Sequence, residues 1–150
     1  MSVVASLDTR VRLEIYRRFV DEGRPPAVGE AAAALREAEG EVEAAYRRLE
    51  RARVIVLAPG TTNVWMASPL SAIPTAFRVE TERGSYWGNC VWDGLGVIAM
   101  LGGDGRLATS CPDCGEPMPL RVRNGELAHA GGVAHFAVPA ARWWENIAYT

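Results

Sequence analysis

The stretch FRVETERGSYWGNCVWDGLGVIAMLGG, residues 77–103, decides the fold of the second half of this 150-residue chain. Its pattern predicts a short strand, a glycine turn and an apolar helix from about residue 89 to residue 101. Within this helix Cys90 and Asp93 are three residues apart, which places them on one face, one turn from each other. A buried carboxylate costs free energy unless a partner or a reaction uses it, so this pair is a candidate site.

The position of Cys90 in the first turn predicts a lowered thiol pKa, because the positive end of the helix dipole favours the thiolate. Trp87 and Trp92 are expected to shield both groups from water, and burial would raise the pKa of Asp93 towards the range of a proton carrier. Spacing alone leaves two interpretations open. Cys90 is either a soft-metal ligand beside a proton carrier or a small buried side chain beside an N-terminal helix acid.

The overall composition is typical of a soluble globular protein, with 49% hydrophobic residues, 23% charged residues and a net charge of −2. The length allows one ordinary domain or two very small ones that share a core. The near-neutral charge gives no general attraction to nucleic acid or to membranes. The longest apolar run, around GLGVIAMLGG, is roughly half the length of a membrane helix.

The cellular location is predicted from the N-terminus and from the cysteines. The opening segment MSVVASLDTRVRLE has neither a basic leader nor a long apolar run, so no signal peptide is expected. An odd number of cysteines, three in all, then indicates reduced thiols in the cytoplasm rather than a disulfide framework.

The first half of the chain predicts three helices followed by a hairpin. Apolar residues at helical spacing give helices over 8–22 (with Asp8 as the N-cap), 28–37 and 40–53, and VIVLAPGTTNVWMAS at 54–68 gives strand, turn and strand. This order is typical of a winged helix-turn-helix. We therefore expect a winged-helix-like module over residues 1–68, packed on a second domain over residues 69–150.

Charges on the third helix argue against DNA binding by this module. In a winged helix the N-terminal half of this helix would face the major groove, and acidic side chains there repel phosphates. Here that half carries Glu39, Glu41 and Glu43, while the arginines come later, at Arg47, Arg48, Arg51 and Arg53. Nucleic acid is therefore not an expected partner, although a metal- or thiol-responsive winged-helix regulator remains the alternative function.

The rest of the chain predicts a small mixed α/β core with short strands, so the fold class is α+β. SPLSAIPTAF at 68–77 has two prolines and is expected to be a surface linker. After the apolar helix come the strand-like segments RLATSC, PLRVRNGEL and GGVAHFAVP, the second with an Asn124-Gly125 hairpin signal. The final segment, WWENIAYT, also contains a strand-like run.

Cys111 and Cys114, in SCPDCGEP, form half of a zinc ribbon, which needs a second ligand pair further along the chain. Cys90 is the only other cysteine, and His129 and His135 lack the usual paired spacing. A reduced pair in a tight turn is therefore favoured over a structural zinc.

A family resemblance appears at this point. The segment YWGNCVWDGLGVIAMLGGDGRLATSCPDCGEPMPLRV, residues 86–122, resembles the core of the alkylmercury (organomercurial) lyases. Those enzymes have a Cys-x-Trp-Asp-x-Leu-Gly helix and then a Cys-Pro-x-x-Gly-x-Pro segment. IPTAFRVE resembles the family segment before this core, and the three-helix module resembles the family's N-terminal region.

The resemblance implies roles for individual residues. Cys90 matches the first catalytic cysteine, Asp93 the catalytic aspartate and Cys111 a structural cysteine, whereas Cys114 stands where the family usually has another residue. The candidate catalytic residues are thus Cys90 and Asp93, and the candidate metal ligands are Cys90, Cys111 and Cys114.

The implied activity is protonolysis of R–Hg⁺ to hydrocarbon and Hg²⁺. Mercury is soft, so thiolates hold it, and the aspartate delivers the proton. A second catalytic cysteine of the family follows a segment like WWENIAYT, and the sequence ends there, at Thr150. The expected partner is a small organomercurial or another soft-metal or thiol-reactive ligand, with no cofactor and no membrane, because mercury is the substrate and the product.

Overall fold

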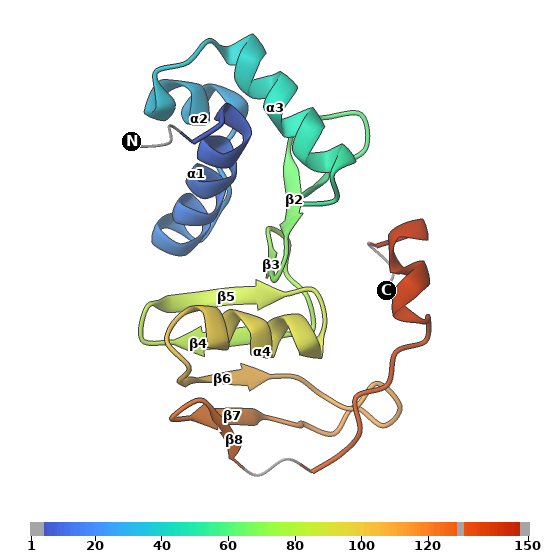
Figure 1. The fold of residues 1–150 in the computed structure, drawn as a ribbon. Helices are drawn as coiled ribbons and strands as arrows, with labels where there is room; N and C mark the ends of the chain where they lie inside the picture. Colours follow the sequence, from blue (N-terminus) through green and yellow to red (C-terminus); the bar gives the residue numbers. More distant parts are fainter. Residues whose placement is uncertain (1–4, 129–130, 148–150) are drawn as a thin grey trace. The chain divides into compact units, whose positions relative to one another are not determined.

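The computed structural model describes residues 5–128 and 131–147 and has the expected α+β class. Helices and antiparallel strands are divided between two compact units, Met1–Ile73 and Pro74–Thr150 (Figure 1). Each unit has its own buried side chains, so each is described by itself.

The first unit is built on three helices, α1 (Leu7–Glu22), α2 (Val28–Leu35) and α3 (Glu39–Arg51). Each helix buries one apolar face against the other two, as the helical spacing predicted. The fully buried side chains include Val11, Ile15, Phe19, Ala31, Val42, Ala45 and Tyr46. The hydroxyl of Tyr46 donates to the backbone oxygen of Pro26 at 3.0 Å, which pairs the one polar atom of this buried ring.

The N-cap of α1 differs from the prediction. Ser6, and not Asp8, caps the helix, and its hydroxyl accepts a hydrogen bond from the Thr9 N–H at 3.2 Å. Asp8 lies in the first turn and accepts from the Arg48 guanidinium on α3, with a shortest distance of 2.6 Å. This pairing holds the pKa of Asp8 below its usual value. The carboxylate therefore joins two helices instead of ending one.

Three short antiparallel strands complete the first unit: β1 (Val56–Leu57), β2 (Val64–Ala67) and β3 (Leu70–Ser71). The β1–β2 hairpin follows the helices in the order expected of a winged-helix-like module, which stays a prediction. The expectation of a surface linker over 68–77 was wrong for its first part, because Leu70 and Ser71 form β3 and are both buried. Leu70 supplies the apolar side chain that brings this segment into the core.

The second unit is an antiparallel sheet with one helix. Its strands are β4 (Arg78–Thr81), β5 (Gly84–Gly88), β6 (Gly105–Ala108), β7 (Leu120–Arg123) and β8 (Glu126–Ala128), in the spatial order β5-β4-β6-β7-β8. The β7–β8 turn has Asn124 and Gly125 with φ values of 53° and 75°, as its hairpin signal predicted.

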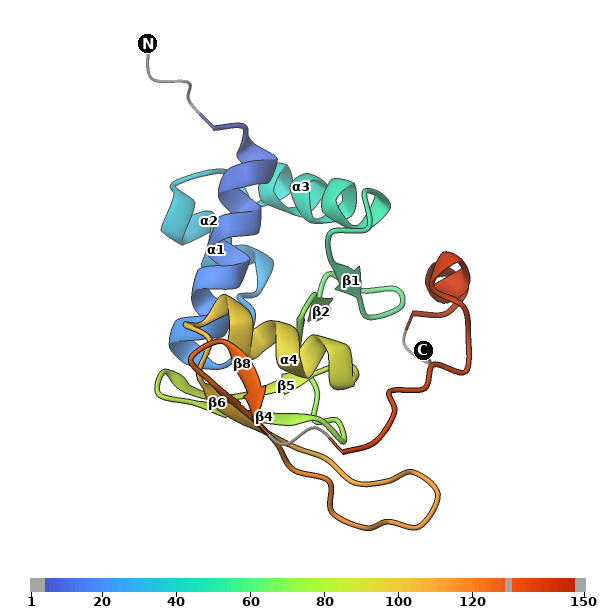
Figure 2. The same cartoon turned by 60° about the horizontal axis from the view of Figure 1, so that its bottom comes forward.

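Helix α4 (Val91–Met100) lies across β4, β5 and β6 (Figure 2). The core between helix and sheet consists of fully buried aliphatic side chains: Val79, Val97, Ile98 and Leu107. Val79 pairs with Tyr86 on β5 and with Leu107 on β6, which sets the register of the central strands. The residues that precede and begin α4 are therefore fixed by the best-packed part of this unit.

One expectation for the C-terminal region was wrong. The segment GGVAHFAVP, residues 131–139, forms no strand, and Val133 is 92% exposed, so its side chain packs against nothing that would hold a strand. A 3₁₀-helix, Ala140–Glu145, contains the two tryptophans of the final segment, and the end of the strand-like run that follows them, residues 148–150, lies outside the described residues. His129 lies outside the described residues.

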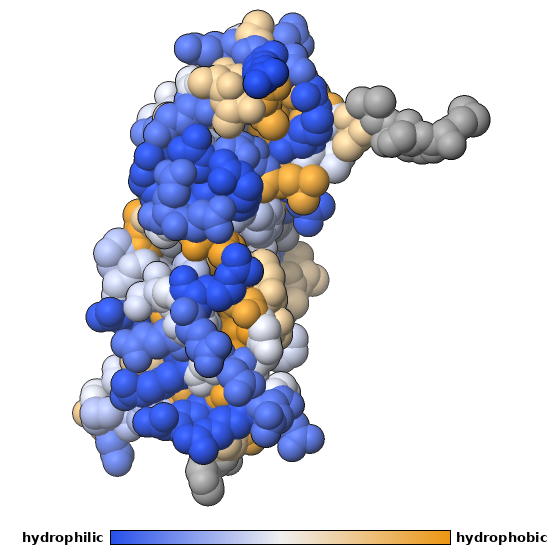
Figure 3. Space-filling view, turned by 90° about the vertical axis from the view of Figure 1, so that its left-hand side faces the viewer, coloured by the Kyte–Doolittle hydropathy of each residue, from blue (hydrophilic) through white to orange (hydrophobic). Residues whose placement is uncertain are grey.

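On the face drawn in Figure 3, hydrophilic residues predominate and hydrophobic ones form small separate areas. Among the described residues, no helix has both the length and the apolar character needed to cross a membrane.

Candidate functional site

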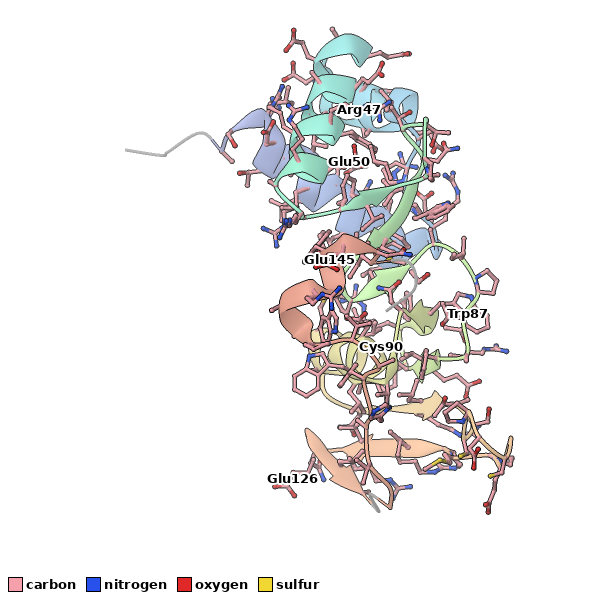
Figure 4. All side chains as sticks on the ribbon, turned by 90° about the vertical axis from the view of Figure 1, so that its right-hand side faces the viewer. Arg47, Glu50, Trp87, Cys90, Glu126 and Glu145 are labelled. Atoms are coloured by element: carbon pink, nitrogen blue, oxygen red, sulfur yellow. The ribbon has the colours of Figure 1, made fainter. Side chains whose placement is uncertain are left out.

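Cys90 lies at the junction between β5 and α4, where it is the N-cap of the helix (Figure 4). Its backbone is extended, and its sulfur accepts a hydrogen bond from the Asp93 N–H at 3.4 Å. The Cys90 carbonyl accepts from the Gly94 N–H at 2.9 Å, which closes the first helical turn. Cys90 thus starts the helix, and Asp93 is held within one turn of it.

Two glycines allow α4 to lie this close to the sheet. A Cβ on Gly88, at the end of β5, would come within 2.6 Å of the Gly94 nitrogen. A Cβ on Gly94 would come within 2.7 Å of a methyl carbon of Leu107 on β6. The Gly88 carbonyl also accepts from the Thr75 hydroxyl at 2.5 Å. The missing side chains at these two positions therefore place the Cys90–Asp93 turn directly against the core.

The pKa of the Asp93 carboxyl group is shifted in the direction that the sequence predicted. Burial raises the pKa of its carboxyl group above the usual value, while hydrogen bonds from Asn89 and from the Cys90 thiol act in the opposite direction. The net effect favours the protonated carboxyl more than in water. A proton is thus more available on this side chain near neutral pH than on an exposed aspartate.

The thiol pKa of Cys90 is shifted in the direction opposite to the prediction. Its thiol pKa is raised, first because the side chain is buried and also because the Asp93 carboxylate disfavours a second negative charge beside it. The N–H of Asp93 favours the thiolate but does not outweigh burial. The expectation of a lowered pKa counted the helix N-terminus and omitted desolvation. The raised pKa favours the thiol over the thiolate, and the thiol donates towards the Asp93 carboxylate.

The two tryptophans beside the site differ in their exposure to solvent. Trp87 on β5 is partly buried, and the Arg78 guanidinium lies 5.9 Å from the centre of its ring. Trp92 on α4 is 68% exposed, so the expectation that it shields the site was wrong. The helix turns this ring outwards into solvent.

Asn89 is a site residue that sequence reasoning missed. Both its side-chain amide and its backbone N–H donate to the Asp93 carboxylate. Its own side-chain oxygen is buried without a hydrogen-bond partner in the structure. The signal was an asparagine just before a helix start, a position where such side chains commonly bond to nearby groups of the first turn.

Cys111 and Cys114 lie elsewhere in this unit, in the connection between β6 and β7. All three cysteines are free thiols. Within residues 5–128 and 131–147, no three His, Cys, Asp or Glu side chains come together as a metal site, so Cys90 does not join the other two cysteines in such a group. Hydrogen bonds from the backbone of Cys114 and Asp113 lower the pKa of Cys111, the opposite of the shift at Cys90.

Comparison with known proteins gives a family and a fold. The family model described as alkylmercury lyase, MerB, matches residues 70–150. Among solved structures, the chain is similar to one described as the mercury-bound form of MerB2, with 21% identical residues and a TM-score of 0.64. This likeness covers 81% of the present chain and 58% of the other, so the chain spans less than two thirds of that protein. No curated protein sequence matches the chain.

Proposed function

The chain belongs to the alkylmercury lyase family, and we propose that it cleaves carbon–mercury bonds in small organomercurials, with Cys90 as the mercury ligand and Asp93 as the proton carrier. The observation that carries this proposal is the mutual contact of Cys90 and Asp93 in the first turn of α4, inside the segment that matches the family. A soft ligand and a protonatable carboxyl group within one turn are what protonolysis requires.

Capture of the substrate is the first step. The Cys90 sulfur bonds to the mercury of R–Hg⁺, and the thiol proton passes to the Asp93 carboxylate, to which the thiol already donates. The products are Cys90–S–Hg–R and a neutral Asp93 carboxyl group. The raised pKa values of both groups support this route, because the thiol keeps its proton until mercury arrives and the carboxyl group can then retain it.

Cleavage is the second step. The Asp93 carboxyl group gives its proton to the carbon bound to mercury, the carbon–mercury electron pair forms the new C–H bond, and R–H leaves. A second thiolate binds the mercury before cleavage and polarises the carbon–mercury bond, so the Hg²⁺ that remains is held by the Cys90 sulfur and by this second thiolate. A small thiol in solution can supply this second ligand in an assay. Asn89 acts as a positioning residue, since its amide orients the carboxylate through a hydrogen bond.

Incubation with phenylmercury and excess cysteine tests the proposal. Benzene is measured by gas chromatography and released Hg²⁺ by a chelating dye. The wild-type protein should release one benzene for each Hg²⁺, whereas Cys90→Ser should release none, because a hydroxyl is too hard to hold mercury. Cys114→Ser is the matched control and should keep the activity, because Cys114 is exposed and lies outside the Cys90–Asp93 turn. Benzene release by Cys90→Ser at the wild-type rate, or none from the wild type, would overturn the proposal.

A further inference from the structure

The connection between β6 and β7 forms a closed hairpin loop that carries two cysteines in the sequence Cys111-Pro-Asp-Cys114. An isolated antiparallel bridge between Ser110 and Pro117 closes its base. Inside the loop, the Cys111 N–H donates to the Glu116 oxygen at 2.8 Å and the Gly115 N–H donates to the Cys111 oxygen at 2.9 Å. Gly115 has a φ of 73°, which lets the chain reverse immediately after Cys114.

This turn directs the two thiols towards each other. The backbone N–H groups of Asp113 and Cys114 and the thiol of Cys114 all donate towards the Cys111 sulfur. Cys111 is partly exposed and Cys114 is exposed, so both sulfur atoms are accessible from solvent. The loop itself extends beyond the strands that it joins (Figure 2). The carboxyl groups of Asp113 and Glu116 belong to the same loop and favour a cation beside it.

Two facing sulfur atoms without further ligands select a particular class of metal. Zinc in proteins is held by four ligands, or by three and a water molecule. Among the described residues, no third His, Cys, Asp or Glu lies near enough to Cys111 and Cys114 to make a group of three. Soft cations prefer thiolates over other protein ligands, and two thiolates suffice for a cation that accepts two-coordinate binding.

We propose that Cys111 and Cys114 form a two-sulfur site for one soft cation such as Hg²⁺, separate from Cys90. Binding forms two S–Hg bonds and releases the two thiol protons to solvent, with no change of oxidation state. The site does not require cleavage of a carbon–mercury bond, so it stands or falls independently of the proposed lyase activity. If that activity is present, the loop gives its Hg²⁺ product a second place to bind on the same chain.

Titration of the reduced Cys90→Ser protein with HgCl₂ in the absence of oxygen tests the site. The expected result is one Hg²⁺ for each chain, seen as an ultraviolet sulfur-to-mercury charge-transfer band, with two protons released. Both Cys111 and Cys114 should then be protected from iodoacetamide, as mass spectrometry of peptides would show. Zn²⁺ in place of Hg²⁺ should give neither protection nor stoichiometric binding.

Single replacements in the same background provide the control. Cys111→Ser and Cys114→Ser each leave one sulfur in the loop, so the advantage of two linked ligands is gone. Competing glutathione should then remove Hg²⁺ at a concentration at least about 10²-fold lower than the concentration needed for the Cys90→Ser protein. The proposal fails if either variant retains Hg²⁺ as the Cys90→Ser protein does, if mercury protects only one thiol, or if Zn²⁺ binds as strongly as Hg²⁺.

Discussion

Replacement of Gly88 by alanine tests whether the close approach of α4 to β5 builds the site. The added Cβ would lie 2.6 Å from the Gly94 nitrogen, 2.8 Å from the Gly94 Cα and 3.1 Å from the Asp93 carbonyl carbon. All three are backbone atoms, so no side chain can rotate away. Ordinary contact begins at 3.4 Å, which means that the first turn of α4 must withdraw by about 0.8 Å, the difference between 3.4 and 2.6 Å.

Such overpacking against backbone should lower the free energy of unfolding of this unit by about 1–3 kcal/mol. The same shift moves Cys90 and Asp93 relative to the sheet, and a displacement of about 1 Å at a reacting centre costs on the order of 10²-fold in rate. Stability is measured by urea denaturation followed by tryptophan fluorescence. Amide hydrogen exchange in α4 and β5 assigns the loss to this unit.

Gly40→Ala is the control for the general effect of adding a methyl group to a glycine. Gly40 lies in α3, has no heavy atom within 4 Å of a built Cβ and has no positive φ. Its replacement should leave stability unchanged or raise it by up to about 1 kcal/mol, because alanine favours the helix. If Gly88→Ala unfolds at the same urea concentration as the wild type and exchanges α4 amides no faster, the packing argument for the site is wrong.

Three further results are expected. Iodoacetamide should alkylate Cys111 below the pH at which a free thiol reacts and Cys90 only above it, because their pKa values are shifted in opposite directions; equal pH profiles by peptide mass spectrometry would contradict this. The Arg24 guanidinium lowers the pKa of Glu30 from 4.5 to about 2, so the stability that this pair adds is complete above pH 4.5 and is lost as the pH falls towards 2. The urea midpoint of Glu30→Gln should accordingly lie below that of the wild type at pH 7, with the difference closing near pH 2, and a difference independent of pH would refute the linkage. Duplex DNA should bind weakly and without sequence preference at physiological salt, because the acidic first turn of α3, which begins at Glu39, repels phosphate; a sequence-selective gel shift would reverse this conclusion.

Local signals in the sequence predicted the parts of the fold that depend on local chemistry. Apolar spacing gave the three N-terminal helices and α4, and Asn124-Gly125 gave the β7–β8 turn. The segment with Leu70 was misread because two prolines suggested a linker, whereas the chain turns back so that Leu70 pairs with Ala67 of β2, three residues earlier, and is buried. Asp8 was misread because its partner, Arg48, is forty residues away, a contact that local signals do not report.

The two site residues could be predicted from the sequence, but how deeply the structure buries Cys90 and how far it exposes Trp92 could not. The spacing of Cys90 and Asp93 placed them in one helical turn, and burial of Asp93 was correctly expected to raise its pKa. The sign of the Cys90 shift was missed because it depends on how deeply the sheet buries the sulfur, which spacing does not report. The exposure of Trp92 depends on which face of α4 meets the sheet.

The most direct test of the central claim is phenylmercury capture and benzene release measured in the same sample of Asp93→Asn. Asparagine keeps the shape of the side chain but cannot carry a proton, so the Cys90–phenylmercury adduct should still form and be visible by intact-protein mass spectrometry. Benzene release should fall by roughly 10²–10⁴-fold relative to the wild type, the usual contribution of a positioned proton carrier. Benzene release by Asp93→Asn at the wild-type rate would contradict the role of Asp93 and with it the proposed mechanism.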